Sequence, residues 1–263
     1  MIFLVFLVCL FASAAGSICG IGGGVIIKPV LDALGIMSVS EISFLSGCTV
    51  FAMSLVSVYR NVRNKNAKLN LKTATSLAIG AAAGGILGKT MFQELKNIVE
   101  SESMVGLVQA SVLIGITGGT LLYTIWKEKI KTKQYRNPVL CLGIGILLGI
   151  MSSFLGIGGG PINLVVLVYC FSMTTKEAAL SSLYIIMFSQ AASLVQTCVT
   201  HTVPKVEPIY FVVMVLGGIL GGNLGSRLNG KIKDKKVNQL FMMLMGIIIL
   251  INIYNVVQFA MQI

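Results

Sequence analysis

Apolar segments long enough to cross a lipid bilayer fill most of this sequence and restrict its fold more than any other feature. Six segments reach about 20 residues, and 1–19 and 138–155 nearly do; about 20 apolar residues span the hydrocarbon core. Only 11% of the 263 residues are charged, whereas soluble domains carry about 25%. We therefore expect an all-α integral membrane protein. The predicted helical segments are 1–19, 25–37, 41–59, 73–92, 104–126, 138–155, 161–173, 177–199, 206–226 and 237–260.

The sequence GIGGG occurs twice, at residues 20–24 and 156–160. Glycine is the costliest ordinary residue in a helix, so each run predicts a break. The segments that follow, 25–37 and 161–173, have 13 residues each, which gives about 20 Å of helix against a bilayer core of about 30 Å. Each run therefore precedes a half-helix that is too short to cross.

The two halves of the chain match at three points that keep nearly the same spacing. The glycine runs match at an offset of 136 residues, and so do Glu41 with Glu177 and Ser46 with Ser182. The third match is GGILG (84–88) with GGNLG (221–225), whose offset is one residue larger. We interpret these matches as a duplication. The predicted units are a first membrane repeat at 1–126, a basic linker at 127–136 and a second membrane repeat at 137–263.

Fifteen of the 20 Lys and Arg residues lie in three loops, 60–72, 127–136 and 227–236, which the positive-inside rule assigns to the cytoplasm. Loop 60–72 is basic but its counterpart 196–208 is not. Loop 227–236 is basic, whereas its counterpart 89–102 is of mixed charge. Repeats of opposite orientation produce this swap, so we predict an inverted repeat in the cell membrane with both termini outside.

An inverted repeat requires each glycine run to join the two arms of a broken hairpin, either re-entrant or fully crossing. The alternative is eight helices in which each run merely bends one long helix. The first fifteen residues lack the positively charged start of a signal peptide and have a counterpart in the second half, so we take them as the first membrane helix.

The net charge of +11 does not indicate nucleic-acid binding, because the basic residues lie between membrane segments rather than on a polar domain. The six cysteines form no C-x-x-C pair, and the one histidine, His201, lies in a polar loop. We expect buried thiols, no metal site and no cofactor.

An unwound glycine run inside a membrane leaves the first N–H groups of the next half-helix without partners, at the positive end of its dipole. Such a place favours an anion. Two runs approaching from opposite faces match the arrangement of a secondary transporter site. The remaining glycines we assign to close helix packing, namely Gly84, Gly85, Gly88, Gly115, Gly118, Gly119, Gly143, Gly145, Gly149, Gly221, Gly222 and Gly225.

Polar residues within the spans complete the candidate site. Lys28, in the first half-helix, could add charge for an anion; the alternative is that it reaches to the membrane interface. Hydroxyls and amides can hold an oxyanion without burying a full charge, although each could instead join two helices. The expected substrate-binding residues are Gly22, Gly23, Gly24, Lys28, Ser46, Gly158, Gly159, Gly160, Asn163, Ser182 and Gln190.

Glu41 and Glu177 begin equivalent helices, where a carboxylate suits the helix dipole. We favour this capping role, and keep both residues as candidates for coupling to a proton.

These features resemble the TauE/SafE family of sulfite exporters and probable membrane transporter proteins. The resemblance covers essentially the whole chain and rests on the duplicated GIGGG, on Pro29, and on GIGILLGIMSSFLGIGGG at 143–160. The second copy departs from the first, because Val165 stands where the first has Pro29, and Pro161 directly follows the glycines. The resemblance implies a carrier of sulfite, sulfonates or related organic or sulfur-containing anions.

We therefore expect a secondary transporter of a small anion such as sulfite, thiosulfate or an organosulfonate, working by alternating access between the two glycine runs. A proton or ion gradient, or the gradient of the anion itself, would drive it. An anion channel is the nearest alternative. A membrane-embedded enzyme would need paired catalytic groups, whereas Asp32 and Asp234 stand alone in the sequence, so we do not expect an enzyme. A structural membrane protein would need no central cavity.

Overall fold

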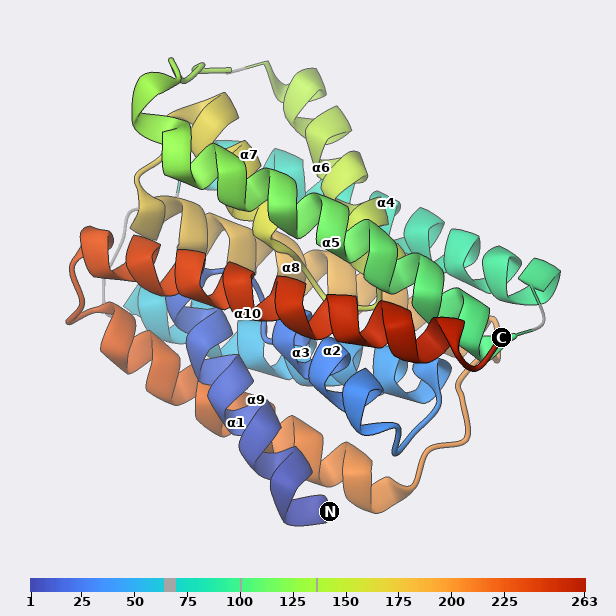
Figure 1. Cartoon of the computed structure of the whole chain (residues 1–263). Helices are drawn as coiled ribbons and strands as arrows, with labels where there is room; N and C mark the ends of the chain where they lie inside the picture. The colour runs from blue at the N-terminus through green and yellow to red at the C-terminus, as the bar shows by residue number, and fades with distance from the viewer. Residues whose placement is uncertain (64–69, 100, 136) are drawn as a thin grey trace.

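The computed structural model describes residues 1–63, 70–99, 101–135 and 137–263, and no strand occurs within these ranges (Figure 1). The helices in the described ranges are α1 (Ile2–Cys19), α2 (Gly24–Leu34), α3 (Val39–Arg63), α4 (Leu71–Val99), α5 (Glu102–Trp126), the 3-10 turn η1 (Lys127–Lys129), α6 (Pro138–Phe154), α7 (Pro161–Phe171), α8 (Thr175–Val199), α9 (Pro208–Asn229) and α10 (Asp234–Ala260).

In the described part of the chain, seven helices are long and apolar enough to cross a membrane, which agrees with the expected all-α membrane class. They are α1, α3, α4, α5, α8, α9 and α10. Helices α2 and α7 have 11 residues each, fewer than the predicted 13, because left-handed residues at Gly35 and Ser172 end them. Helix α4 extends to Val99, beyond the predicted end at residue 92.

The chain reverses at the first glycine run. Helix α1 lies along α9 in the same direction, because Gly217 packs on Cys9 and Gly225 packs on Ala14. Helix α2 instead runs alongside α10, where Asn255 donates to the carbonyl of Pro29 and Gly35 lies beside Gln258. Helix α1 runs with α9 and α2 runs with α10, and α10 returns from the end of α9. Helices α1 and α2 therefore point in opposing directions.

The chain also reverses at the second run. Helix α6 follows α4 in the same direction, with Gly80 against Leu142 and Gly88 against Ile150. Helix α7 then returns to the linker that precedes α6. There the N–H groups of Lys133 and Tyr135 donate to the carbonyls of Tyr169 and Cys170 at 2.7 and 3.0 Å.

Close helix packing explains most of the remaining glycines, as predicted. A Cβ atom on Gly84 would lie 2.1 Å from the carbonyl oxygen of Ile146, and one on Gly225 would lie 2.3 Å from that of Ala14. The same tight approach occurs at Gly85, Gly88, Gly145, Gly149, Gly221 and Gly222. Packing within the described chain does not explain Gly115, Gly118, Gly119 and Gly143, because a Cβ atom added at these positions would meet no atom of another described helix within 4 Å.

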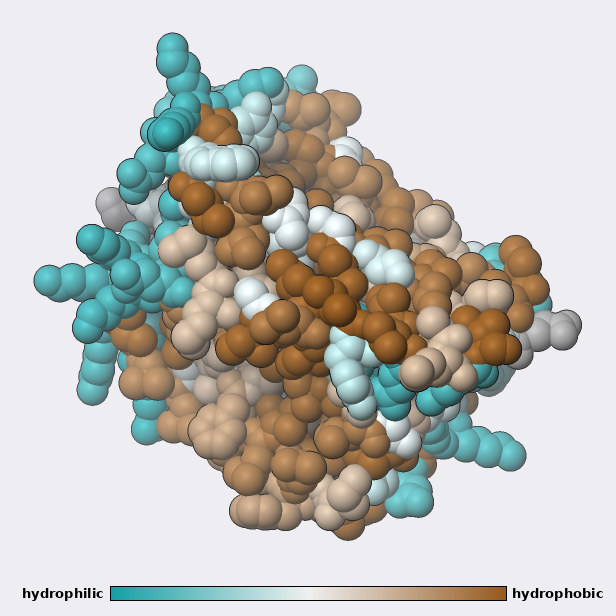
Figure 2. Space-filling view, viewed as in Figure 1, coloured by the Kyte–Doolittle hydropathy of each residue, from teal (hydrophilic) through white to brown (hydrophobic). Residues whose placement is uncertain are grey.

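The described residues of the three basic loops lie at one end of the helix bundle. Arg60 at the end of α3 contacts Asn223 near the end of α9, and Lys127 at the end of α5 donates to Asn238 near the start of α10. Helices α4 and α6 begin side by side at the same end. Figure 2 shows hydrophilic side chains gathered at the left of the molecule and apolar side chains across its middle. Lys65, Lys68, Glu100 and Arg136 lie outside the described residues.

Candidate functional site

The two GIGGG runs touch each other in the core of the molecule. A Cβ atom on Gly24 would lie 2.0 Å from the carbonyl oxygen of Ile157, and one on Gly22 would lie 3.1 Å from that of Gly158. Ile21 and Ile157 are 0% and 1% exposed and belong to one hydrophobic cluster. The two backbones therefore approach at a distance that a side chain at Gly24 would prevent.

The N–H groups of residues 22–24 and 158–160 have no partner among the described residues, whereas those of Gly20, Ile21 and Gly156 donate to backbone carbonyls just before each run. Helix α2 begins at Gly24 and α7 begins at Pro161, and neither has a side-chain cap. Among the described residues, no acceptor lies within hydrogen-bond geometry of the N–H groups of residues 22–24 or 158–160. Buried backbone N–H groups are almost always paired, so these unpaired donors are candidates for binding a ligand at the starts of α2 and α7, where the helix dipole is positive.

Hydroxyl groups surround the two runs, and they too lack partners. The Ser46 Oγ would be 2.6 Å from a Cβ atom on Gly24, that of Ser13 would be 3.0 Å from one on Gly23, and that of Ser43 would be 2.5 Å from one on Gly156. None of the three hydroxyls has a hydrogen-bond partner among the described residues. Ser153, Ser182 and the Oδ1 atom of Asn163 are buried and unpaired in the same way.

A small cavity adjoins the second run. It has a volume of about 10 Å³, roughly the room for one water molecule. Gly159, Gly160, Asn163 and Ser152 line it, and Gln190 donates to the Ser152 hydroxyl at 3.2 Å. Of the residues predicted from sequence, Gly159, Gly160 and Asn163 therefore face a common space, and Gln190 reaches it through Ser152.

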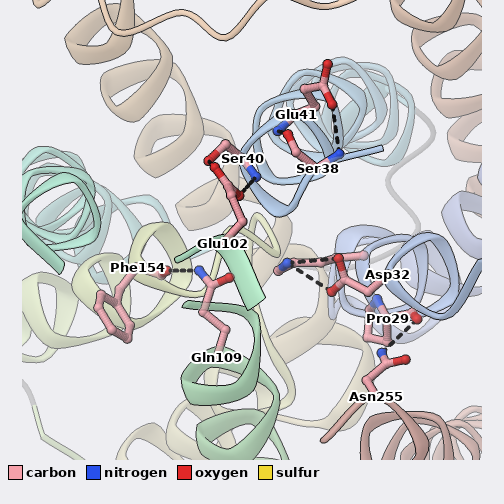
Figure 3. A network of polar contacts seen from close by, with 10 residues as sticks. Pro29, Asp32, Ser38, Ser40, Glu41, Glu102, Gln109, Phe154 and Asn255 are labelled. Carbon is pink, nitrogen blue, oxygen red and sulfur yellow. Dashed lines mark hydrogen bonds and ion pairs between the residues drawn. The ribbon is translucent and has the colours of Figure 1, made fainter. Parts of the chain in front are cut away.

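Lys28 is buried and forms an ion pair. Its ammonium lies 3.0 Å from a carboxylate oxygen of Asp32, one helical turn further along α2, and the two residues are 3% and 8% exposed. The sequence did not predict this ion pair, which forms because the period of the helix places the two side chains on one face. Figure 3 shows Asp32 near Pro29, whose carbonyl accepts the Asn255 amide at 2.9 Å.

Glu41 and Glu177 lie at the beginnings of α3 and α8. The N–H of Ser38 donates to Glu41 at 2.7 Å, and Glu177 forms a capping box with Thr174. Each carboxylate thus satisfies a backbone donor at a helix start, the role that the sequence favours for both.

Ser13, Ser43 and Ser153 are not among the site residues predicted from the sequence. A pattern was available for Ser153, which stands three residues before its glycine run as Ser17 does in the first half. It could not reveal that Ser17 is paired with Ser57 and Ser226 whereas Ser153 is unpaired.

Comparison with known families adds an independent finding to this geometry. A family model described as "Sulfite exporter TauE/SafE" matches residues 5–252. The chain belongs to this family. The TauE/SafE match includes both glycine runs and covers all or most of each of the seven helices of spanning length in the described part, so the chain is a multi-pass membrane protein of a transporter family. Comparison with curated proteins and with solved structures finds no match.

Proposed function

We propose that this TauE/SafE protein is a secondary carrier of small sulfur-containing anions, such as sulfite, thiosulfate or an organosulfonate. The observation that carries the proposal is the contact of two glycine runs in which the N–H groups of residues 22–24 and 158–160, with the hydroxyls of Ser13, Ser43 and Ser46 beside them, have no partner among the described residues. Such donors can replace the hydration of an oxyanion without burying a second charge.

The anion would bind between residues 22–24 and residues 158–160. Ser46, Ser182 and Asn163 would add polar contacts, and Gln190 would act through Ser152. Lys28 is already paired with Asp32. Its proposed role is therefore to contribute to the electrostatic potential near the start of α2, and not to contact the anion as a free charge.

Alternating access follows from treating residues 1–126 and 137–263 as inverted repeats. The hairpin α1–α2 and the hairpin α6–α7 would then open toward opposite faces, while the glycine runs stay near the midplane. We place the three basic loops in the cytoplasm and both termini outside the cell membrane. A proton or ion gradient would drive transport, with Glu41 and Glu177 as candidate coupling groups.

Flux measurements in proteoliposomes test this function. Purified protein should accumulate radiolabelled sulfite, thiosulfate or a sulfonate under an imposed gradient. The flux should saturate and show counterflow, which a channel would not. If none of these anions accumulates under any gradient, the sulfur-anion proposal is wrong.

Gly160→Ala tests the location of the site. Gly160 has an extended backbone with φ −161°, and its added Cβ would lie 3.5 Å or more from described neighbours, so the variant should fold. The methyl group would reach the cavity beside Asn163 and should weaken substrate affinity about tenfold, the effect of one methylene in a fitted pocket. The matched control is Gly115→Ala, whose Cβ meets no described atom within 4 Å. Equal flux from the two variants would place the site elsewhere.

A further inference from the structure

A second cavity lies away from the glycine runs, at the end of the molecule opposite the three basic loops. It has a volume of about 310 Å³ and lies between the last turns of α4 and the loop at residues 202–204. Lys89, Gln93, Lys96 and Asn97 line it from α4. Residues spaced by three, four, seven and eight positions lie on one face of a helix, so α4 directs two ammonium groups and two amides toward the same space.

Lys89 is the unusual member of this lining. It is 7% exposed, yet no described acidic side chain pairs with its ammonium and no described acceptor hydrogen-bonds to it. The ring of Phe92 lies 4.9 Å from the ammonium, a cation–π contact worth about 0.5–2 kcal/mol, and the Cys48 thiol also interacts electrostatically with it. The ammonium lines the cavity and has no fixed partner among the described residues, so its three donors are available to a ligand there.

Lys96, in contrast, is held in place. Its ammonium lies 2.9 Å from a carboxylate oxygen of Glu102 and 2.9 Å from the Ser40 hydroxyl. Ser40 in turn donates to Glu102 at 2.6 Å, as Figure 3 shows for Ser40 and Glu102. With Lys89, Lys96 and Glu102 together, the cavity retains one net positive charge, and Gln93 and Asn97 add amide donors.

We propose that this cavity binds an oxyanion group of one or two negative charges, contacted directly by Lys89 and secondarily by Lys96 and Gln93. The site is separate from the proposed central site and does not depend on transport. A phosphate headgroup of an anionic lipid presents the same chemistry as free sulfate or phosphate. We assign the site to a soluble ion, because the cavity is lined mainly by polar and charged side chains of α4.

Protection of an introduced thiol tests the proposal without measuring flux. Gln93→Cys is made in full-length protein in which Cys48, Cys170 and Cys198 are replaced by serine; Cys9, Cys19 and Cys141 are buried and stay. Modification by the neutral reagent methyl methanethiosulfonate is followed in delipidated protein as sulfate is added. Sulfate should slow the modification, and sodium chloride at equal ionic strength should not.

Lys89→Met, added to the Gln93→Cys protein, should raise the sulfate concentration for half-protection about tenfold or more, the effect of losing one charge-assisted hydrogen bond. Lys89→Arg should retain protection. The matched control is Gln262→Cys, which lines a different cavity at the same end beside Asp32 and Glu102; sulfate should not protect it.

Three results would overturn the assignment. Unchanged protection after Lys89→Met would remove Lys89 from the site. Equal protection by chloride would reduce the effect to ionic screening. Protection by phosphatidylglycerol in nanodiscs but not by sulfate would assign the cavity to a lipid headgroup. None of these results depends on whether the protein carries sulfur anions.

Discussion

At the scale of single residues, the informative feature is the contrast between paired and unpaired buried hydroxyls. Ser17 lies 2.9 Å from the Ser57 hydroxyl and 3.0 Å from that of Ser226, so it joins α1 to α3 and α9. Ser46 is equally buried but has no partner among the described residues. A buried polar group left unpaired costs about 1–3 kcal/mol, a cost that ligand binding would offset.

Ser46→Ala should therefore weaken substrate affinity about tenfold, the value of roughly one hydrogen bond, and leave stability unchanged or slightly higher. Ser17→Ala should do the reverse, lowering stability by about 1–2 kcal/mol because Ser57 and Ser226 lose their common partner. Substrate titration of initial flux and unfolding in mixed micelles measure the two effects. If both variants lose stability equally and neither changes affinity, Ser46 serves helix packing alone.

At the scale of elements, α2 carries a buried ion pair in a helix of 11 residues. Removing one partner of such a pair strands the other charge and costs about 3–5 kcal/mol, whereas apolar replacement of both is often neutral. The half-helix is also held from outside by the contact of Asn255 with Pro29, so its position depends on α10 as well as on its own sequence.

Lys28→Met should destabilise the protein by about 3–5 kcal/mol, and adding Asp32→Leu should recover most of that loss. Lys96→Met is the control, because the pair of Lys96 and Glu102 is about 40% exposed and such pairs contribute about 1 kcal/mol or less. Equal stability of the Lys28→Met single variant and the wild type would show that the pair is not buried as the structure places it.

At the scale of the whole molecule, the two hairpins and the three basic loops make a prediction about sidedness. Helices α3 and α8 are antiparallel, because Gly47 lies beside Gln190 while Val50 and Ile186 both lie beside Gly22. The start of α4, which follows α3, and the loop after α8 therefore lie at opposite ends of the bundle. Lys72 and Lys205 are exposed positions at these two ends.

Lys72→Cys and Lys205→Cys, each made in the background without Cys48, Cys170 and Cys198, should be labelled from opposite sides of the membrane. A membrane-impermeant maleimide applied to intact cells should react with the Lys205→Cys protein. The same reagent should react with the Lys72→Cys protein only in inverted vesicles. Labelling of both from the same side would overturn the inverted repeat and the two-sided site with it.

The sequence alone determined the membrane class, the breaks at the glycine runs and the short half-helices, because hydropathy, helix length and glycine content act locally. It also predicted the packing role of Gly84 and Gly225. Only the tertiary structure decided which glycines have no neighbour, such as Gly115, and that Ser46 is unpaired where Ser17 is bonded. The pairing of Lys28 with Asp32 follows the helix period, but its burial does not. These properties depend on which helix packs against each face, and the pattern of a single segment does not contain that information.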